Sequence, residues 1–167
     1  MSFDFHFFMF GIFPYFALIV LIFGSILRFD RDPYSWRSKS SQLLRRRQLS
    51  LGSNFFHVGI LVVLAGHAVG LLTPIWVFDA MGIAHGFKQQ MAMTVGGIAG
   101  VLCLVGILIL LHRRLFDPRI RATSSWRDIV VLALLLAQLL LGLGTIPVSS
   151  HHMDGAEMLK FMSWAQH

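Results

Sequence analysis

The stretch NFFHVGILVVLAGHAVGLLTP, residues 54–74, decides the fold class of this chain. It contains no Asp, Glu, Lys or Arg, and an apolar helix of about 20 residues is long enough to cross the hydrocarbon core of a membrane. Pro74 ends the stretch, because proline cannot continue the hydrogen-bond ladder of a helix. These residues therefore predict a membrane-spanning helix.

The remainder of the sequence has the same character. Of its 167 residues 56% are apolar and 13% charged, against roughly 45–50% and about 25% in soluble domains. Four apolar segments reach spanning length, at about 5–27, 55–76, 91–111 and 129–148. We expect an all-α, polytopic membrane helix bundle with a single membrane domain over 1–167. The spans leave no room for a large soluble catalytic domain.

Basic residues predict the orientation of the spans. Segment 28–53 holds seven of the 14 Lys and Arg residues, and segment 112–128 holds five. Cytoplasmic loops carry such an excess, so we expect both segments to be cytoplasmic, and the N-terminus and the tail 149–167 to be periplasmic. No basic residue precedes Arg28. The first apolar stretch is therefore expected to remain as a span, since a signal peptide carries positive charge ahead of its apolar core.

The basic segments have other possible roles. Arg-rich stretches also bind nucleic acid, but in a chain made mostly of spans the membrane surface explains them more simply, and we expect no nucleic-acid partner. Segment 28–53 also contains Tyr34, Trp36, Leu43 and Leu44. This mixture is typical both of a docking site for a cytoplasmic protein and of a loop at the level of the lipid headgroups, and the residues leave the two alternatives open.

Two histidines inside the second span are the candidates for chemistry, because ionisable groups in a membrane are costly. His57 and His67 are about 15 Å apart along a helix, too far to share one metal ion. Each could instead bind a separate haem iron as a neutral ligand. A stripe of Gly59, Gly66 and Gly70 could let a flat macrocycle approach the backbone. Hydrogen bonding to another helix, and helix packing by glycine, are the alternatives.

Five stretches resemble the gamma, or cytochrome b, subunit of bacterial respiratory nitrate reductase. They are GSNFFHVGIL (52–61), GLLTP (70–74), KQQMAM (88–93), RRLFDPRIRATSS (113–125) and HMDGAEMLK (152–160). The resemblance covers essentially the whole chain in order. It implies a subunit in the bacterial inner membrane that contains two b-type haems and oxidises quinol at the periplasmic side.

The resemblance also implies roles for individual residues. His57 matches the axial ligand of the inner haem and His67 that of the outer haem, while Lys88, Gly66 and His67 match the quinol site; Gly59 and Gly70 are expected to contact the cofactors. Electrons would pass to an iron–sulfur beta subunit and then to a molybdenum-containing alpha subunit, which reduces nitrate to nitrite. The family's second axial histidines lie on a fifth helix, and this sequence ends at His167, ahead of such a helix.

Three other functions are compatible with a membrane bundle. The chain could be a haem-free anchor for soluble subunits, or a dihaem subunit of a different quinol-linked reductase. A small transporter is disfavoured, because the third and fourth spans offer almost nothing ionisable, only Cys103 and the uncharged Gln138. Covalent c-type haem is excluded by the absence of a Cys-x-x-Cys-His run.

Overall fold

The computed structural model describes residues 4–35, 44–151 and 155–166, which contain helices and turns but no strand. The chain divides into two compact units, 1–40 and 41–167, and each is described by itself. In the described residues four helical segments are long and apolar enough to cross a membrane: Phe5–Arg31, Arg46–Leu72, His85–Phe116 and Trp126–Ser150. The predicted all-α membrane bundle with four spanning helices is confirmed.

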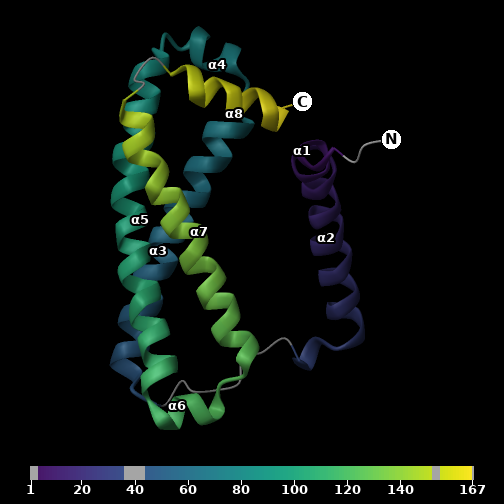
Figure 1. The fold of residues 1–167 in the computed structure, drawn as a ribbon, viewed down its shortest axis with the longest axis vertical. Helices are drawn as coiled ribbons and strands as arrows, with labels where there is room; N and C mark the ends of the chain where they lie inside the picture. The colour runs from purple at the N-terminus through teal and green to yellow at the C-terminus, as the bar shows by residue number, and fades with distance from the viewer. Residues whose placement is uncertain (1–3, 36–43, 152–154, 167) are drawn as a thin grey trace. The chain divides into compact units, whose positions relative to one another are not determined.

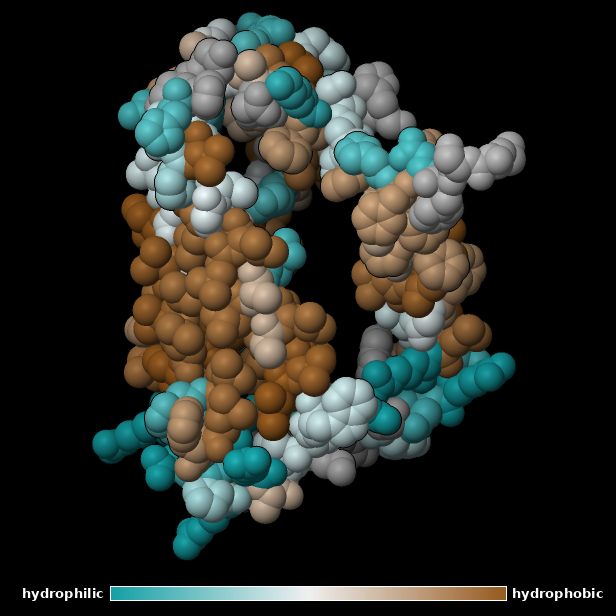
Figure 2. All heavy atoms as spheres, viewed as in Figure 1, coloured by the Kyte–Doolittle hydropathy of each residue, from teal (hydrophilic) through white to brown (hydrophobic). Residues whose placement is uncertain are grey.

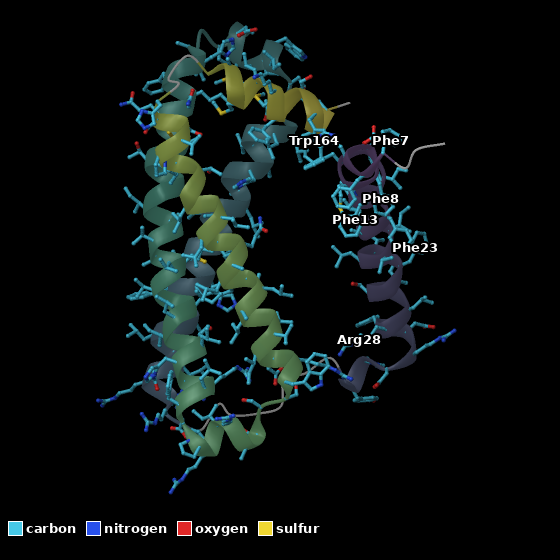
Figure 3. The ribbon with its side chains drawn as sticks, viewed as in Figure 1. Phe7, Phe8, Phe13, Phe23, Arg28 and Trp164 are labelled. Carbon is cyan, nitrogen blue, oxygen red and sulfur yellow. The ribbon has the colours of Figure 1, made fainter. Side chains whose placement is uncertain are left out.

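The first unit is one long helical segment with a change of winding near its start. Helix α1 (Phe5–Phe7) leads into the π-helical turn η1 (Phe8–Ile12), and α2 (Phe13–Arg31) follows. The rings of Phe8 and Phe13 lie 6.4 Å apart between centroids (Figure 3). Gly11 and Pro14, where the sequence predicts a bend, lie where π winding gives way to α winding. The short 3-10 turn η2 (Pro33–Ser35) follows α2.

The second unit is built around helix α5, which packs against α3 and, less extensively, against α7 (Figure 1). Its helices are α3 (Arg46–Leu72), α4 (Ile75–Ala80), α5 (His85–Phe116), α6 (Pro118–Thr123), α7 (Trp126–Ser150) and α8 (Ala156–Gln166). Helices α3, α5 and α7 run antiparallel to their chain neighbours, so α6 lies at one end of this unit and α4 and α8 at the other (Figure 1). We call these the α6 end and the α8 end.

Small residues bring α3 and α5 into close contact. A Cβ atom added to Gly59 would lie 2.6 Å from the carbonyl oxygen of Ala99 and 2.8 Å from Cβ of Cys103. One added to Gly106 would overlap the backbone of Phe56. Close backbone approach at glycine and alanine drives helix association in lipid, where burial of apolar area gives no driving force between helices.

The outer surface of the second unit is apolar along most of its length. Figure 2 shows a hydrophobic band between hydrophilic atoms at the two ends of this unit. Helix α7 has no buried residue, although Leu143 contacts α5 at Gly100. The spanning helices have mean hydropathies of 2.1 to 2.6 over their most apolar stretches. Apolar side chains on an outward face are stable in contact with lipid, so this surface fits a membrane environment.

Most helices extend past the ends of the predicted spans, as α3 does at Arg46 and α5 at His85 and Phe116. The C-terminal end of α3 is the exception, because α3 ends at Leu72 and the predicted span 55–76 extends past it into α4; Pro74 lacks the N–H needed to continue α3. Helix α7 continues through Pro147 to Ser150, and a capping box of Ser125 and Asp128 starts it.

The α6 end is fixed by polar contacts to arginine and aspartate. Arg113 is 2% exposed and donates from Nη2 to the carbonyl oxygen of Leu44 at 2.8 Å. Asp117 accepts hydrogen bonds from two backbone N–H groups at the start of α6 and pairs with Arg45. Burial raises the pKa of Asp117, but these N–H groups and Arg45 outweigh it and hold that pKa below its ordinary value.

Replacing Gly106 with alanine is expected to destabilise the α3–α5 pair by about 1–3 kcal/mol, because overpacking a tight contact forces the backbones apart. The measurement is unfolding of the purified protein by increasing sodium dodecyl sulfate, followed by circular dichroism. The matched control is Gly142→Ala on α7, where the added Cβ meets no atom within 4 Å. Equal destabilisation by the two substitutions would show that the contact at Gly106 is not a tight one.

Candidate functional site

His57 lies on α3 with its ring held by the preceding helical turn. Its Nδ1 lies 2.7 Å from the carbonyl oxygen of Ser53 and 3.1 Å from the Ser53 hydroxyl. A carbonyl oxygen can only accept, so the short contact places the ring hydrogen on Nδ1. In the neutral imidazole the other nitrogen, Nε2, then carries a lone pair, and the side chain is exposed on the helix surface.

His67 repeats this arrangement ten residues further along α3. Its Nδ1 lies 2.8 Å from the carbonyl oxygen of Val63, and its side chain is also exposed. Histidines that bind metal commonly donate their second N–H to a carbonyl or carboxylate, which fixes both tautomer and ring orientation. Both residues therefore have the donor set and geometry that an axial ligand to haem requires.

The two histidines remain separate sites in the structure. They lie on one helix, about 15 Å apart along its axis, with His57 toward the α6 end and His67 toward the α8 end. Within the described residues no group of three or more His, Cys, Asp and Glu side chains could hold a metal ion. Any metal bound at His57 or His67 must then take its remaining ligands from a cofactor or from another segment.

The predicted glycine stripe divides into two parts. Gly59 faces α5 and contributes to the helix contact, whereas Gly66 and Gly70 have no atom within 4 Å of an added Cβ. The open space at Gly66 and Gly70 adjoins His67, which leaves room for a flat molecule near that ring. Gly59 has no such space, and its expected contact with a cofactor stays a prediction.

Lys88 lies on the first turn of α5, at the α8 end. Its Nζ donates to the thioether sulfur of Met162 at 2.9 Å and lies 3.6 Å from the centroid of the Phe78 ring. Met162 is completely buried on α8, and Phe78 belongs to α4. Three helices therefore position this ammonium group.

Helix α8 also attaches to the end of the histidine-bearing helix. Gln166 donates from Nε2 to the carbonyl oxygens of Leu71, at 2.9 Å, and Thr73, at 3.0 Å. These are groups that a helix C-terminus leaves without intrahelical partners. Met162 and Gln166 are one helical turn apart, so α8 brings Lys88 close to the C-terminal end of α3.

The start of α8 is fixed by a glycine that no other residue could replace easily. Gly155 has φ = +80°, and an added Cβ would lie 2.8 Å from Cβ of His85. The predicted tail 149–167 contains a helix, α8, that the prediction does not include. The signal was present in apolar residues at helical spacing, namely Met158, Leu159, Met162 and Ala165.

Replacing Gln166 with alanine is expected to loosen α8 from α3. Two hydrogen bonds at about 1 kcal/mol each are lost, so amide hydrogen exchange in α8 should accelerate about 5- to 30-fold. The measurement is hydrogen–deuterium exchange by mass spectrometry on the membrane complex. Ser163→Ala, at an exposed position of the same helix, is the control, and unchanged exchange in the Gln166 variant would show that these bonds do not fasten α8.

Comparisons with known proteins show the family to which the chain belongs. A family model described as nitrate reductase gamma subunit matches residues 6–167. The chain is 52% identical to the respiratory nitrate reductase 1 gamma chain of Escherichia coli (strain K12) over 159 residues, which are 95% of this chain and 70% of that relative. It is 48% identical to the respiratory nitrate reductase 2 gamma chain of the same organism, with the same coverage.

A more distant relative extends the comparison to another bacterium. The nitrate reductase gamma chain of Bacillus subtilis (strain 168) is 45% identical over 132 residues, which are 79% of this chain and 59% of that relative. Together with the four spanning helices, these likenesses identify a multi-pass protein of the bacterial inner membrane. The chain belongs to the nitrate reductase gamma subunit family and is a membrane subunit of a nitrate reductase.

Proposed function

We propose that this chain is the dihaem b subunit that oxidises quinol for nitrate reductase. The observation that carries the proposal is the repeated geometry on α3, where each histidine donates from Nδ1 to the carbonyl four residues earlier. In a membrane helix this leaves two neutral Nε2 atoms directed away from the helix. Such atoms are costly without a partner in lipid, and a haem iron supplies one without adding a buried charge.

In this proposal His57 holds the haem nearer the α6 end, and His67 holds the haem nearer the α8 end. Open space at Gly66 and Gly70 accommodates the flat ring beside His67. The second axial ligands come from a further helix, as the family resemblance implies. When bound, the two haems supply one-electron carriers within the membrane.

The basic residues support a cytoplasmic location for the α6 end. Arginines of α3, α5, α6 and α7 and of the turn before α3 gather there, namely Arg45, Arg46, Arg47, Arg113, Arg114, Arg119, Arg121 and Arg127, whereas Lys88 and Lys160 are the Lys and Arg residues of the α8 end of this unit. The positive-inside rule then makes the α8 end periplasmic. The proposed single membrane domain has its cytoplasmic loops at 28–53 and 112–128, of which residues 36–43 lie outside the described part of the chain.

Quinol oxidation is proposed at the α8 end, beside His67, Gly66 and Lys88. Each quinol releases two electrons and two protons and becomes quinone. The Lys88 ammonium donates a hydrogen bond to a substrate oxygen and stabilises negative charge that develops there as the proton leaves. The protons are released to the periplasm, and the electrons leave toward the α6 end.

Nitrate is a suitable final acceptor for these electrons. Moving one electron inward against 100 mV, negative inside, costs about 2.3 kcal/mol, so the acceptor must be strongly oxidising. We propose that an iron–sulfur beta subunit receives the electrons at the α6 end and that a molybdenum-containing alpha subunit uses them. There nitrate takes two electrons and two protons and yields nitrite and water.

The histidine assignments are tested by replacing His57 and His67 singly with alanine in the membrane complex. Each substitution should remove one b-type haem, because the iron loses the ligand that α3 contributes, and quinol-dependent nitrate reduction should be lost. The measurements are the reduced b-type absorption band and the haem content per complex. His112→Ala, an exposed histidine near the end of α5, is the control. Full haem content in both variants would instead support the haem-free anchor.

The quinol site is tested by Lys88→Ala. A hydrogen bond from a charged group contributes about 1.5–3 kcal/mol, so kcat/KM for quinol should fall about 10- to 100-fold. Nitrate reduction driven by a viologen dye that reduces the soluble subunits directly should be unchanged. Lys160→Ala removes the same charge at the same end of the unit and is the control. A normal kcat/KM for Lys88→Ala would refute the site.

A further inference from the structure

We propose that Met162 is a positioning residue, which holds Lys88 through a weak acceptor and so keeps its ammonium group available to the substrate. This inference rests on the proposed quinol site and extends it to a side chain of α8. The interaction that suggests it is the 2.9 Å contact from Lys88 Nζ to Met162 Sδ. A buried ammonium group more commonly pairs with a carboxylate or carbonyl oxygen.

The partners of Lys88 share one property, which is that they bind a cation weakly. A thioether sulfur is a weak acceptor, and an aromatic ring attracts a cation without accepting a conventional hydrogen bond. Met162 contacts the ammonium at 2.9 Å and the Phe78 ring lies 3.6 Å from it. An ammonium group has three N–H donors. Met162 and Phe78 therefore hold the Lys88 ammonium in position while engaging few of its N–H donors.

The nearby carboxylate lies beside another side chain, that of His85. Asp79 attracts Lys88 electrostatically, yet its Oδ1 lies 3.5 Å from Nε2 of His85. A direct Lys88–Asp79 ion pair would compete with any substrate oxygen for the ammonium protons. Met162 and Phe78, which bind a cation only weakly, contact Lys88 in place of that strong acceptor.

Met162 is held in a fixed position by the rest of α8. Its side chain is completely buried, and Gln166, one turn later, is bonded to two carbonyl oxygens at the end of α3. The thioether is therefore fixed relative to the helix that carries His67. Through this connection α8 sets where the Lys88 ammonium lies with respect to the proposed outer haem ligand.

The test compares Met162→Gln and Met162→Leu in the membrane complex, with duroquinol as the electron donor. Glutamine has about the size of methionine but adds a strong carbonyl acceptor, so it should compete with substrate and raise KM about 5- to 10-fold, with kcat within twofold of wild type. Leucine keeps the volume but removes the sulfur that positions Lys88, so its KM should rise about twofold, less than that of Met162→Gln. Met81→Gln, at a methionine that is 67% exposed, is the control and should leave KM unchanged.

Two results would overturn the inference: a wild-type KM in Met162→Gln, or a rise in Met162→Leu as large as that in Met162→Gln. Lys88→Ala, measured in parallel, separates the inference from the proposed function. If Lys88→Ala is impaired and Met162→Gln is not, only the role of Met162 fails; if Lys88→Ala is normal, the quinol site fails.

A second measurement does not depend on turnover or on accumulation of the glutamine variant. Lys88 is modified with an amine-reactive reagent and quantified by peptide mass spectrometry, with and without duroquinone. Protection by duroquinone should persist in Met162→Leu but require about twofold more duroquinone, because loss of a weak partner leaves the ammonium less well positioned yet still able to bind the quinone. Loss of protection in Met162→Leu would refute the proposed weak contact.

Discussion

The close contact between α3 and α5 is the constraint on which the second unit depends. Lipid offers no hydrophobic driving force between helices, so their association relies on close packing. Gly59 and Gly106 provide it, each opposite the backbone or first side-chain atoms of the other helix. This contact fixes which face of α3 is covered by protein. On an ideal helix His57 lies about 160° around from Gly59 and His67 about 80°, so both rings stay clear of the packed face.

The spacing of residues on α3 thus places the contact with α5 and the proposed haem ligands at different positions around one helix. Gly59, at the middle of α3, approaches α5, whereas Gly66 and Gly70 lie nearer the α8 end and have open space beside them. The same residue type consequently has two roles that depend on position. Periodicity alone could not distinguish them, because all three glycines share a stripe and only the helix crossing determines which of them meets a neighbour.

Much of the architecture could be predicted from the sequence, because lipid imposes simple rules on apolar length and on helix ends. The four spanning helices, the end of α3 before Pro74 and the Ser125–Asp128 capping box follow from local chemistry. The continuation of α7 through Pro147 does not, since this proline removes one bond of the hydrogen-bond ladder near the end of α7 and the outcome depends on its surroundings. The contact of α8 with Lys88 joins residues distant in sequence, which no local pattern specifies.

The environment of Lys88 illustrates why such distant contacts matter for chemistry. A lysine at the end of a span could pair with a carboxylate, and Asp79 is near enough to attract it. A strong ion pair would hold the ammonium firmly but would have to break before a neutral substrate could be bound. Sulfur and an aromatic ring hold the same charge with less competition. Because Met162 and Gln166 share one short helix, the position of that charge is tied to the end of α3, and any displacement of α8 would alter Lys88 and the surroundings of His67 together.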